Sequence, residues 1–192
     1  MNKESIKKIY LEKRKRLSPE ELEFKNKKIQ YQLFQGIDFS TKQIVHTFLP
    51  IQKSNEINIW PIITYIRGNF KDIKIIISKS DFKTLEMTHY LYKENTILLE
   101  NDFGIPEPHQ GEIYLKSEFD IILIPLVAFD LQGHRVGYGK GFYDRFLITC
   151  NPETIKVGLS LFDPVPKIMD LNEHDIGLDH CATPESFYTF KK

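Results

Sequence analysis

The strongest constraint on the fold is an apolar strand pattern followed directly by a glycine-rich segment and a short helix pattern. Residues 119–125 are mainly apolar and predict a buried strand, and residues 142–149 predict a helix. The segment 130–147 contains Gly133, Gly137, Gly139 and Gly141. A strand, a glycine-rich loop and a helix in this order are typical of phosphate-binding sites. Glycines let the backbone approach an anion, and the free N–H groups at the helix start point towards it.

Two well-known phosphate-binding loops are excluded by the spacing of these residues. A P-loop requires Gly-Lys followed by Ser or Thr, and here Lys140 is followed by Gly141. The dinucleotide fingerprint Gly-x-Gly-x-x-Gly also fails, because Phe142 stands where its third glycine is required. The segment therefore predicts a phosphate site of another kind.

Charged residues accompany the glycines. Arg135 and Lys140 stand among them, and Asp144 lies one turn into the expected helix. Two cations and a run of backbone amides suit a polyphosphate, whereas a carboxylate would repel it unless a Mg²⁺ ion bridges the two. The alternative is a tight loop with solvated charges, but four glycines within nine residues favour a backbone that bends sharply or approaches a ligand.

Strand and helix patterns alternate along the chain, which predicts a three-layer α/β/α sandwich with a largely parallel, Rossmann-like sheet. The length of 192 residues fits one α/β domain, on which residues 1–36 pack as an N-terminal helical pair. Strands are expected at 43–49, 72–78, 87–92 (a weaker edge strand), 119–125, 154–159 and 180–183, and helices at 3–17, 19–35, 56–67 and 142–149. The helix 19–35 is expected to begin with a capping box, in which Ser18 is the N-cap and Glu21 stands three residues after it. The segments 101–108 and 162–181 are expected to be loops and turns.

Three positions outside the glycine segment leave alternatives open. Glu56 is expected at the N-terminus of the helix 56–67, beyond the carboxyl end of a strand, where it is equally a ligand-binding or a capping carboxylate. Phe103 is either a core residue or an exposed stacking ring. Lys3, Lys7 and Lys8 form a basic cluster, for which a solvated helix face is the more common explanation.

Composition limits the classes of partner. The formal net charge is zero, which argues against nucleic acid or an anionic membrane and is compatible with a monomer. Cys150 and Cys181 form no Cys-x-x-Cys pair, so a zinc site is not expected. The first residues are charged, unlike a secretory signal, and no apolar run has transmembrane length. We therefore expect a cytoplasmic protein with free thiols.

Acidic and histidine residues gather near the C-terminus. Asp170, Asp175 and Asp179 alternate with His174 and His180 in a turn-rich segment. Such residues suit a metal site, although turn and capping roles are about twice as common for any one of them. One carboxylate of this group that joins Asp144 on a Mg²⁺ ion is the arrangement we expect.

The glycine segment resembles a family signature. The run Gly133-x-Arg-x-Gly-x-Gly-Lys-Gly-Phe-Tyr-Asp-Arg145 is similar to that of the 5-formyltetrahydrofolate cyclo-ligase family, also called methenyltetrahydrofolate synthetase. The similarity extends along nearly the whole chain. It includes Lys3-x-x-x-Lys7, the segment 48–50 with Glu56, the loop 101–108, and Asp175 with Asp179. The chain departs from the family pattern at Lys7, where Arg is usual, and at Phe142, where Tyr is common.

The resemblance implies an ATP-dependent conversion of 5-formyltetrahydrofolate to 5,10-methenyltetrahydrofolate, in which the formyl oxygen is phosphorylated and N10 then attacks. It implies catalytic roles for Lys140, Arg135 and Tyr143, and Mg²⁺ on Asp144 and Asp175. The implied ATP-binding residues are Lys3, Lys7, Arg135, Gly137, Tyr138, Gly139, Lys140, Gly141, Phe142, Tyr143 and Asp144. The implied folate-binding residues are Leu49, Glu56, Phe103, Tyr138, Gly139, Lys140, Gly141 and Phe142.

Two other functions fit the same scaffold. One is a different phosphate-handling enzyme, such as a sugar-phosphate isomerase, which needs no ATP. The other is a non-catalytic protein that binds folate or nucleotide without turnover. A requirement for ATP in the reaction distinguishes the cyclo-ligase from both.

Overall fold

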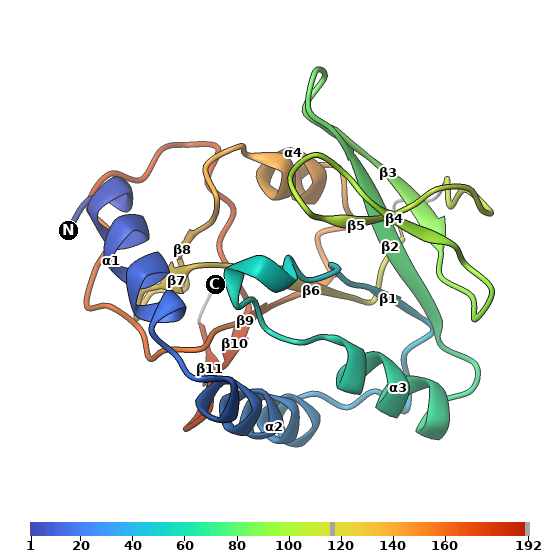
Figure 1. Ribbon diagram of the computed structural model, residues 1–192, viewed down its shortest axis with the longest axis horizontal. Coiled ribbons are helices and arrows are strands. Elements are labelled where there is room, and N and C mark those ends of the chain that lie inside the picture. The colour runs from blue at the N-terminus through green and yellow to red at the C-terminus, as the bar shows by residue number, and fades with distance from the viewer. Residues whose placement is uncertain (116–117, 191–192) are drawn as a thin grey trace.

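A mixed, mostly parallel sheet forms the centre of the protein (Figure 1). The computed structural model describes residues 1–115 and 118–190. Its seven-stranded sheet has the order β11-β10-β9-β6-β1-β2-β3. The strands are β1 (Ile44–His46), β2 (Lys74–Asp81), β3 (Glu86–Leu91), β6 (Ile121–Pro125), β9 (Ile155–Leu159), β10 (His180–Ala182) and β11 (Phe187–Thr189). Only the outer strands β3 and β11 run antiparallel to their neighbours, so the largely parallel sheet and the edge position of β3 are confirmed.

Helices cover both faces of the sheet. Along β6, Ile121 and Leu123 belong to the core between the sheet and the helices α2 (Pro19–Gly36) and α3 (Trp60–Asn69). The alternate residues Ile122 and Ile124 belong to the core between the sheet and α4 (Phe142–Ile148). This alternation is the period of a strand whose two faces are both buried. In Figure 1 the helices α2 and α3 lie below the sheet and α4 above it, which gives the three predicted layers.

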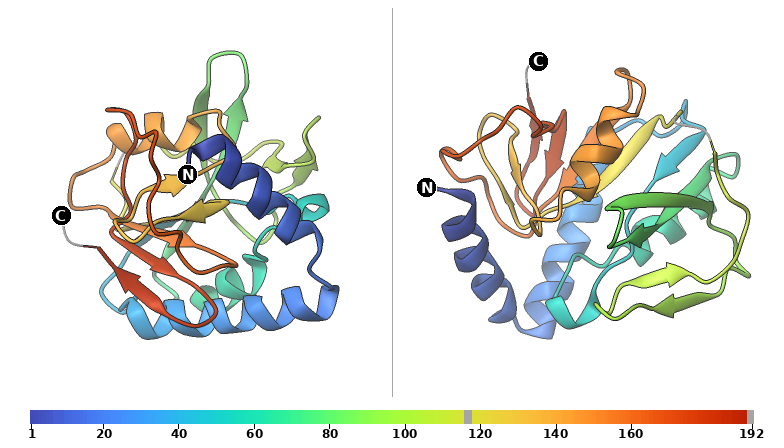
Figure 2. Two further views of the ribbon diagram at one scale, coloured as in Figure 1. Left: turned by 90° about the vertical axis from the view of Figure 1, so that its left-hand side faces the viewer. Right: turned by 90° about the horizontal axis from the view of Figure 1, so that it is seen from above.

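The N-terminal helices have the predicted boundaries to within two residues. Helix α1 (Lys3–Lys15) is capped by Asn2, and α2 begins with the predicted capping box, in which Ser18 and Glu21 exchange side-chain to backbone hydrogen bonds. Helix α1 lies beside a small hairpin of β7 (Ala128–Phe129) and β8 (Arg135–Val136) (Figure 2). This contact brings the basic helix to the glycine segment. No helix in the described ranges is long and apolar enough to cross a membrane.

Two predictions about loops and helices are wrong. Helix α3 begins at Trp60 and not at Glu56, and a short 3-10 turn, η1 (Gln52–Ser54), precedes it. Pro61 then stands in the first helical turn, where its missing N–H costs no hydrogen bond. The segment 101–108 is not all loop, because β5 (Pro106–Pro108) pairs with β4 (Leu98–Glu100) in a separate two-stranded sheet. Prolines are tolerated in a strand of this kind, since it has an open edge.

The glycine-rich segment is not one loop. Strands β7 and β8 divide it, and Gly133 lies in the turn between them with a positive φ of 87°. A Cβ at this position would meet the Phe190 ring at 2.7 Å and the Leu178 carbonyl oxygen at 3.1 Å. Gly133 therefore serves the packing of the hairpin, and the segment that can approach a phosphate shortens to residues 137–141.

Candidate functional site

A cavity of about 740 Å³ opens where β1 and β6 end, at the carboxyl edge of the parallel strands. Open α/β sheets bind ligands at this edge. All the residues that the sequence marked for ATP, folate and metal line this one cavity: Lys3, Lys7, Leu49, Glu56, Phe103, Arg135, Gly137, Tyr138, Gly139, Lys140, Gly141, Phe142, Tyr143, Asp144 and Asp175.

The glycine loop 137–141 presents bare backbone to the cavity. Gly139 and Gly141 have positive φ angles of 89° and 70°, the left-handed conformation that glycine adopts without steric cost. A Cβ at Gly137 would meet no atom within 4 Å. Gly141 is the N-cap of α4, and no side chain of the described residues caps this helix. The loop can therefore bring N–H groups close to an anion.

An ion pair lies at the base of this loop. Arg135 Nη2 donates a 2.7 Å hydrogen bond to Asp144 Oδ1, and Arg135 Nη1 donates to the Ile176 carbonyl. The Arg135 side chain is 6% exposed. Burial lowers the pKa of Arg135, and the charge of Asp144 opposes that shift. Arg135 is thus held behind the loop and is not a free cation at its surface.

A second ion pair joins the two ends of the chain. Lys3 Nζ donates to the Asp175 carboxylate, which also accepts the Asn172 N–H at 2.7 Å. Burial raises the pKa of Asp175, but these hydrogen bonds outweigh it and hold the pKa below its ordinary value. Asp179 instead pairs with Lys156 at 2.8 Å and does not line the cavity. Of the two alternative metal carboxylates, Asp175 is therefore the one beside the glycine loop.

The other two lysines predicted at the site, Lys7 and Lys140, lie at the glycine loop. Lys7 Nζ is 3.4 Å from the Tyr138 carbonyl oxygen, so it reaches the loop backbone. Lys140 is exposed, and its ammonium has no hydrogen-bond or ion-pair partner in the part of the chain that the structure describes. Lys140 is free to contact an anion in the cavity.

Glu56 lines the same cavity. Its Oε2 accepts the Ile51 N–H at 2.6 Å, and its Oε1 accepts the Tyr138 hydroxyl proton. Burial raises the pKa of Glu56, while both hydrogen bonds lower it. Because α3 begins only at Trp60, Glu56 does not cap a helix, and the capping alternative is excluded. A buried carboxylate with one bond on each oxygen keeps lone pairs for a ligand with N–H donors.

Aromatic rings stand at the mouth of the cavity. Phe103 is 55% exposed and stacks on Phe82, with ring centroids 4.1 Å apart. Phe142 meets Phe82 edge to face at 5.1 Å. Phe103 is therefore an exposed stacking ring and not a core residue. Tyr143 lies deeper, and its burial raises the pKa of the phenol.

Comparisons with known proteins identify the family of the chain. The sequence model of the 5-formyltetrahydrofolate cyclo-ligase family matches residues 1–184. The chain belongs to that family. A 5-formyltetrahydrofolate cyclo-ligase of Haemophilus influenzae is 44% identical over 79 residues, which are 38% of this chain and 42% of that protein. A Mycoplasma pneumoniae cyclo-ligase is 28% identical over 165 residues, 83% of this chain and 85% of that protein.

A solved structure extends the similarity to three dimensions. The NMR structure of Aquifex aeolicus 5,10-methenyltetrahydrofolate synthetase has a TM-score of 0.82 and 30% identity, and the match covers 100% of this chain and 94% of that one. The first curated relatives match less fully, because the chain spans less than half of their length: 42% and 36% for the proteins of Haemophilus influenzae and Saccharomyces cerevisiae.

Several residues at or next to the cavity were not predicted. Phe82 and Ser78 reach the cavity from β2 and the turn after it. Arg14 of α1 is buried and donates to the Tyr138 hydroxyl at 2.6 Å. Arg14 follows Ile6 and Tyr10 at intervals of four residues, on the helix face that packs inward. That spacing is the signal that could have separated Arg14 from the exposed basic residues.

Ser78 connects two histidines behind the cavity wall. Its Oγ is 2.6 Å from His46 Nε2 and 3.0 Å from His89 Nδ1. Burial lowers the pKa of His46 well below its ordinary value and lowers that of His89 to about 4. Both rings are therefore neutral at physiological pH, and they pack with Phe119 and Phe146.

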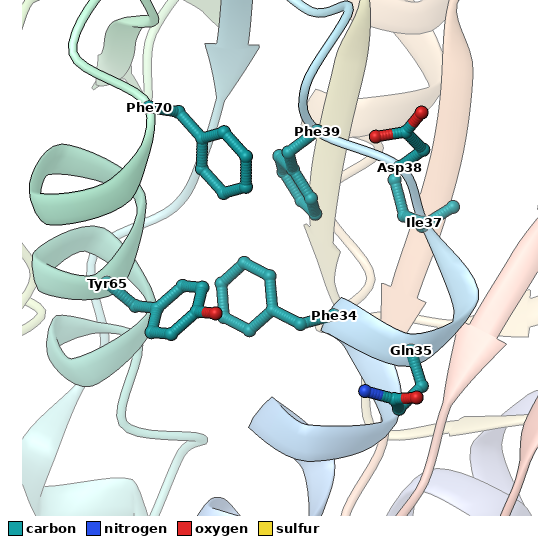
Figure 3. Close-up of a pocket in the computed structure, with 7 residues that line it drawn as sticks. All are labelled: Phe34, Gln35, Ile37, Asp38, Phe39, Tyr65 and Phe70. Atoms are coloured by element: carbon teal, nitrogen blue, oxygen red, sulfur yellow. The ribbon is translucent and has the colours of Figure 1, made fainter.

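A smaller cavity of about 270 Å³ lies between α2 and α3 (Figure 3). Figure 3 shows rings from both helices turned towards one another. The ring centroids of Phe34 and Tyr65 are 4.2 Å apart, those of Phe34 and Phe39 are 5.2 Å apart, and those of Phe39 and Phe70 are 5.9 Å apart. Rings at these distances already contact each other. This space is a gap in aromatic packing, and none of the predicted site residues lines it.

Proposed function

We propose that the protein is an ATP-dependent 5-formyltetrahydrofolate cyclo-ligase, which converts 5-formyltetrahydrofolate and ATP to 5,10-methenyltetrahydrofolate, ADP and phosphate. The observation that carries the proposal is that Glu56 and the glycine loop 137–141 line one cavity and are joined through Tyr138. The reaction requires the formyl group of a flat, donor-rich heterocycle to meet the γ-phosphate. A buried carboxylate facing a phosphate-binding backbone provides both halves in one place.

The chemistry explains why both halves are needed. The N5-formyl group is an amide, and its oxygen is a poor leaving group. Transfer of the γ-phosphoryl group to that oxygen gives an imino-phosphate, N10 attacks the carbon, and phosphate leaves. The protein contributes mainly position and charge neutralisation, as in phosphoryl transfer generally.

On the nucleotide side, the backbone amides of residues 137–141 hold the phosphates. Lys140 neutralises the transferred group, since its exposed ammonium is not engaged by the described residues. Lys3 and Lys7 reach the nucleotide from α1. Arg135 adds positive charge from behind the loop and holds Asp144 in place. Lysine at position 7 keeps the charge of the more usual arginine but loses its bidentate contact.

Asp144 and Asp175 are the proposed Mg²⁺ ligands. Both carboxylates line the cavity beside the loop, and each is paired with a cation, Arg135 or Lys3. Among the described residues no group of three or more acidic, His or Cys side chains gathers around a common point. Mg²⁺ fits this set because it takes one or two carboxylates and completes its shell with phosphate oxygens and water. A bound Mg²⁺ ion would offset the repulsion between the negative phosphates and the two carboxylates.

On the folate side, Glu56 accepts hydrogen bonds from the ring nitrogens and amine of the pterin. Leu49, Phe103 and Phe142 form apolar and aromatic walls for a flat ring. Tyr138 and the backbone of residues 139–141 contact both substrates, and Tyr143 lies where the two meet. At position 142, phenylalanine keeps the stacking surface and lacks the hydroxyl of the more usual tyrosine.

Residues 1–192 act as one domain, with residues 1–36 as its N-terminal helices. The protein works as a cytoplasmic monomer on small molecules, without nucleic acid or membrane. Its neutral net charge supports the choice of partners.

The test is the near-ultraviolet absorbance of the purified protein with 5-formyltetrahydrofolate, with and without Mg-ATP. We expect the methenyl chromophore to grow only when Mg-ATP is present. No growth in folded protein that binds ATP would refute the enzyme and leave a binding protein. Consumption of a sugar phosphate without ATP would instead identify the isomerase alternative.

A further inference from the structure

Arg14 is a buried cation that ends on the folate side of the site. Its exposed fraction is 2%, and it stands near the C-terminal end of α1. Nη1 donates to the Tyr138 hydroxyl oxygen at 2.6 Å, and Nη2 donates to the Leu126 carbonyl at 2.7 Å. Tyr138 in turn donates to Glu56. Three side chains from distant parts of the chain thus form one hydrogen-bonded series.

The hydrogen bonds of this series can donate in only one direction, from Arg14 to Tyr138 and from Tyr138 to Glu56. A guanidinium can only donate, so Arg14 occupies a lone pair of the phenol oxygen. The single phenol proton of Tyr138 is then left for the Glu56 carboxylate. The Ile51 N–H fixes the other oxygen of Glu56 at 2.6 Å. Arg14 therefore sets the orientation of a donor that orients Glu56.

Helix α1 holds Tyr138 at two points. Lys7, two helical turns before Arg14, approaches the carbonyl of Tyr138 at 3.4 Å, and Arg14 binds its hydroxyl. Tyr138 also belongs to the glycine loop. The same helix thus touches the nucleotide side through Lys7 and the folate side through Arg14.

Burying this cation is costly, which argues against a purely structural role. Nε of Arg14 is buried without a hydrogen-bond partner in the described ranges. A neutral side chain with one donor would be enough to join α1 to the Leu126 carbonyl by a hydrogen bond. A guanidinium with an unsatisfied nitrogen is retained where its charge and its fork geometry serve a purpose.

We propose that Arg14 is a positioning residue for the folate substrate, which orients the Tyr138 hydroxyl and so presents the Glu56 carboxylate to the pterin. The inference rests on the proposed function, because it takes Glu56 as the pterin contact. Arg14 itself need not touch the substrate. Its effect on catalysis is expected through folate binding and not through the nucleotide.

The charge of Arg14 also favours the ionised form of Glu56, and this effect can be measured separately through the pH dependence of folate binding. Burial raises the pKa of Glu56, and the charge of Arg14 lowers it; the phenols of Tyr138 and Tyr143 are the other titratable groups near it. Without Arg14, Glu56 ionises only at higher pH. The affinity of an Arg14→Met variant for folate should then rise with pH over a higher pH range than that of the wild type.

The experiment compares steady-state kinetics of the wild type, Arg14→Met, Arg14→Lys and Tyr138→Phe. Arg14→Met should raise the KM for 5-formyltetrahydrofolate about tenfold or more and leave the KM for ATP within about threefold. Arg14→Lys keeps the charge and one donor, so it should recover part of the loss. Arg16→Met is the matched control, because Arg16 is exposed at the end of the same helix and pairs only with Glu12 among the described residues.

Non-additivity tests whether Arg14 acts through Tyr138. Tyr138→Phe should reproduce the rise in folate KM, and the double variant should be no worse than the more affected single variant. Equal loss for ATP and folate, an additive double variant, or a folate KM that is high but independent of pH would overturn the inference. If Arg14→Met does not fold, Tyr138→Phe and Arg14→Lys carry the same test.

The proposed function and this inference fail in different ways. An inactive wild type refutes the cyclo-ligase, and calorimetric titration with 5-formyltetrahydrofolate then replaces KM in the same comparison. An active wild type whose folate affinity is unchanged by Arg14→Met refutes the positioning role alone.

Discussion

Arg135 and Asp144 close the glycine loop at its base through a 2.7 Å ion pair across nine residues of the chain. Arg135 is on β8 and Asp144 is in the first turn of α4. The ion pair therefore holds together the two elements that residues 137–141 connect. The Ile176 N–H also donates to Asp144, at 3.2 Å. A loop held in this way is positioned before any ligand binds, which reduces the entropy lost on binding.

Substitutions can distinguish the proposed metal ligands, Asp144 and Asp175, from Asp179, whose role is structural. Asp144→Asn and Asp175→Asn should each raise the Mg²⁺ concentration for half-maximal activity about tenfold or more, since each removes a charged ligand. Asp179→Asn is the control, because Asp179 pairs with Lys156 away from the cavity. It should lower the free energy of unfolding and leave the Mg²⁺ titration unchanged. The opposite pattern, with Asp179 controlling the Mg²⁺ dependence, would reassign the site.

Two glycines of the segment should respond differently to alanine. Gly133→Ala places a Cβ against Phe190 and the Leu178 carbonyl at positive φ, and should lower the free energy of unfolding by more than about 1 kcal/mol. Gly137→Ala meets no protein atom within 4 Å and should leave stability within about 1 kcal/mol. Its Cβ stands in the cavity and should weaken ATP binding. Thermal unfolding and ATP calorimetry of both variants check this. An unchanged ATP affinity in Gly137→Ala would count against phosphate binding by the backbone of residues 137–141.

Lys140→Ala should reduce kcat about 100-fold or more, because the ammonium is proposed to neutralise charge that develops during transfer. Stability should hardly change, since the described residues offer this side chain no partner. Lys71→Ala is a suitable control, because Lys71 is exposed and does not line the cavity. A kcat for Lys140→Ala within a few-fold of the wild type would remove Lys140 from the catalytic residues.

Glu56→Gln should raise the KM for 5-formyltetrahydrofolate roughly 10- to 100-fold, the loss expected when charge-assisted hydrogen bonds become neutral ones. The amide keeps the shape of the carboxylate and still accepts from Ile51 or Tyr138, so the fold should remain. The KM for ATP should stay near the wild-type value. Direct folate titration gives the same comparison without turnover, and an unchanged folate affinity would exclude Glu56 as the pterin contact.

Stability should fall with acid because of the buried His46 and the half-buried His89. His46 and His89 have lowered pKa values in the folded protein, about 4 for His89, against an ordinary value near 6.5. As the pH falls from about 6.5 to 4, the unfolded chain binds protons there that the folded protein does not. Each ring then costs about 1.4 kcal/mol of stability per pH unit. Above that window the two rings make no difference.

Urea unfolding at several pH values measures this slope. His89→Asn should make the slope shallower, because one titrating group is lost. His174→Asn is the control, since the side chain of His174 is 76% exposed, and it should leave the slope as in the wild type. Equal slopes for the wild type and His89→Asn would show that His89 is protonated in the folded state as readily as in the unfolded one.

Local chemistry explains which elements could be predicted. The capping box of Ser18 and Glu21 and the two-sided apolar run of β6 depend on residues close in the chain, and both appear as expected. Strands β7 and β8 were missed because each has only two residues, too few for a period to be visible. The start of the helix expected at Glu56 was misplaced because neighbours of similar helix propensity do not specify where the first turn forms.

The chemical types of the candidate site residues can be predicted from the chain alone: glycines for a close backbone approach, Lys140 for charge, and Glu56 with aromatic rings for the proposed flat heterocycle. How these residues pair depends on the folded structure. It tied Arg135 to Asp144, placed Asp175 and not Asp179 at the cavity, and assigned Gly133 to packing. It also buried Arg14 beside Tyr138, 124 residues away in sequence. Such partners meet only when the core has formed, because burial and long-range contact, not local spacing, select them.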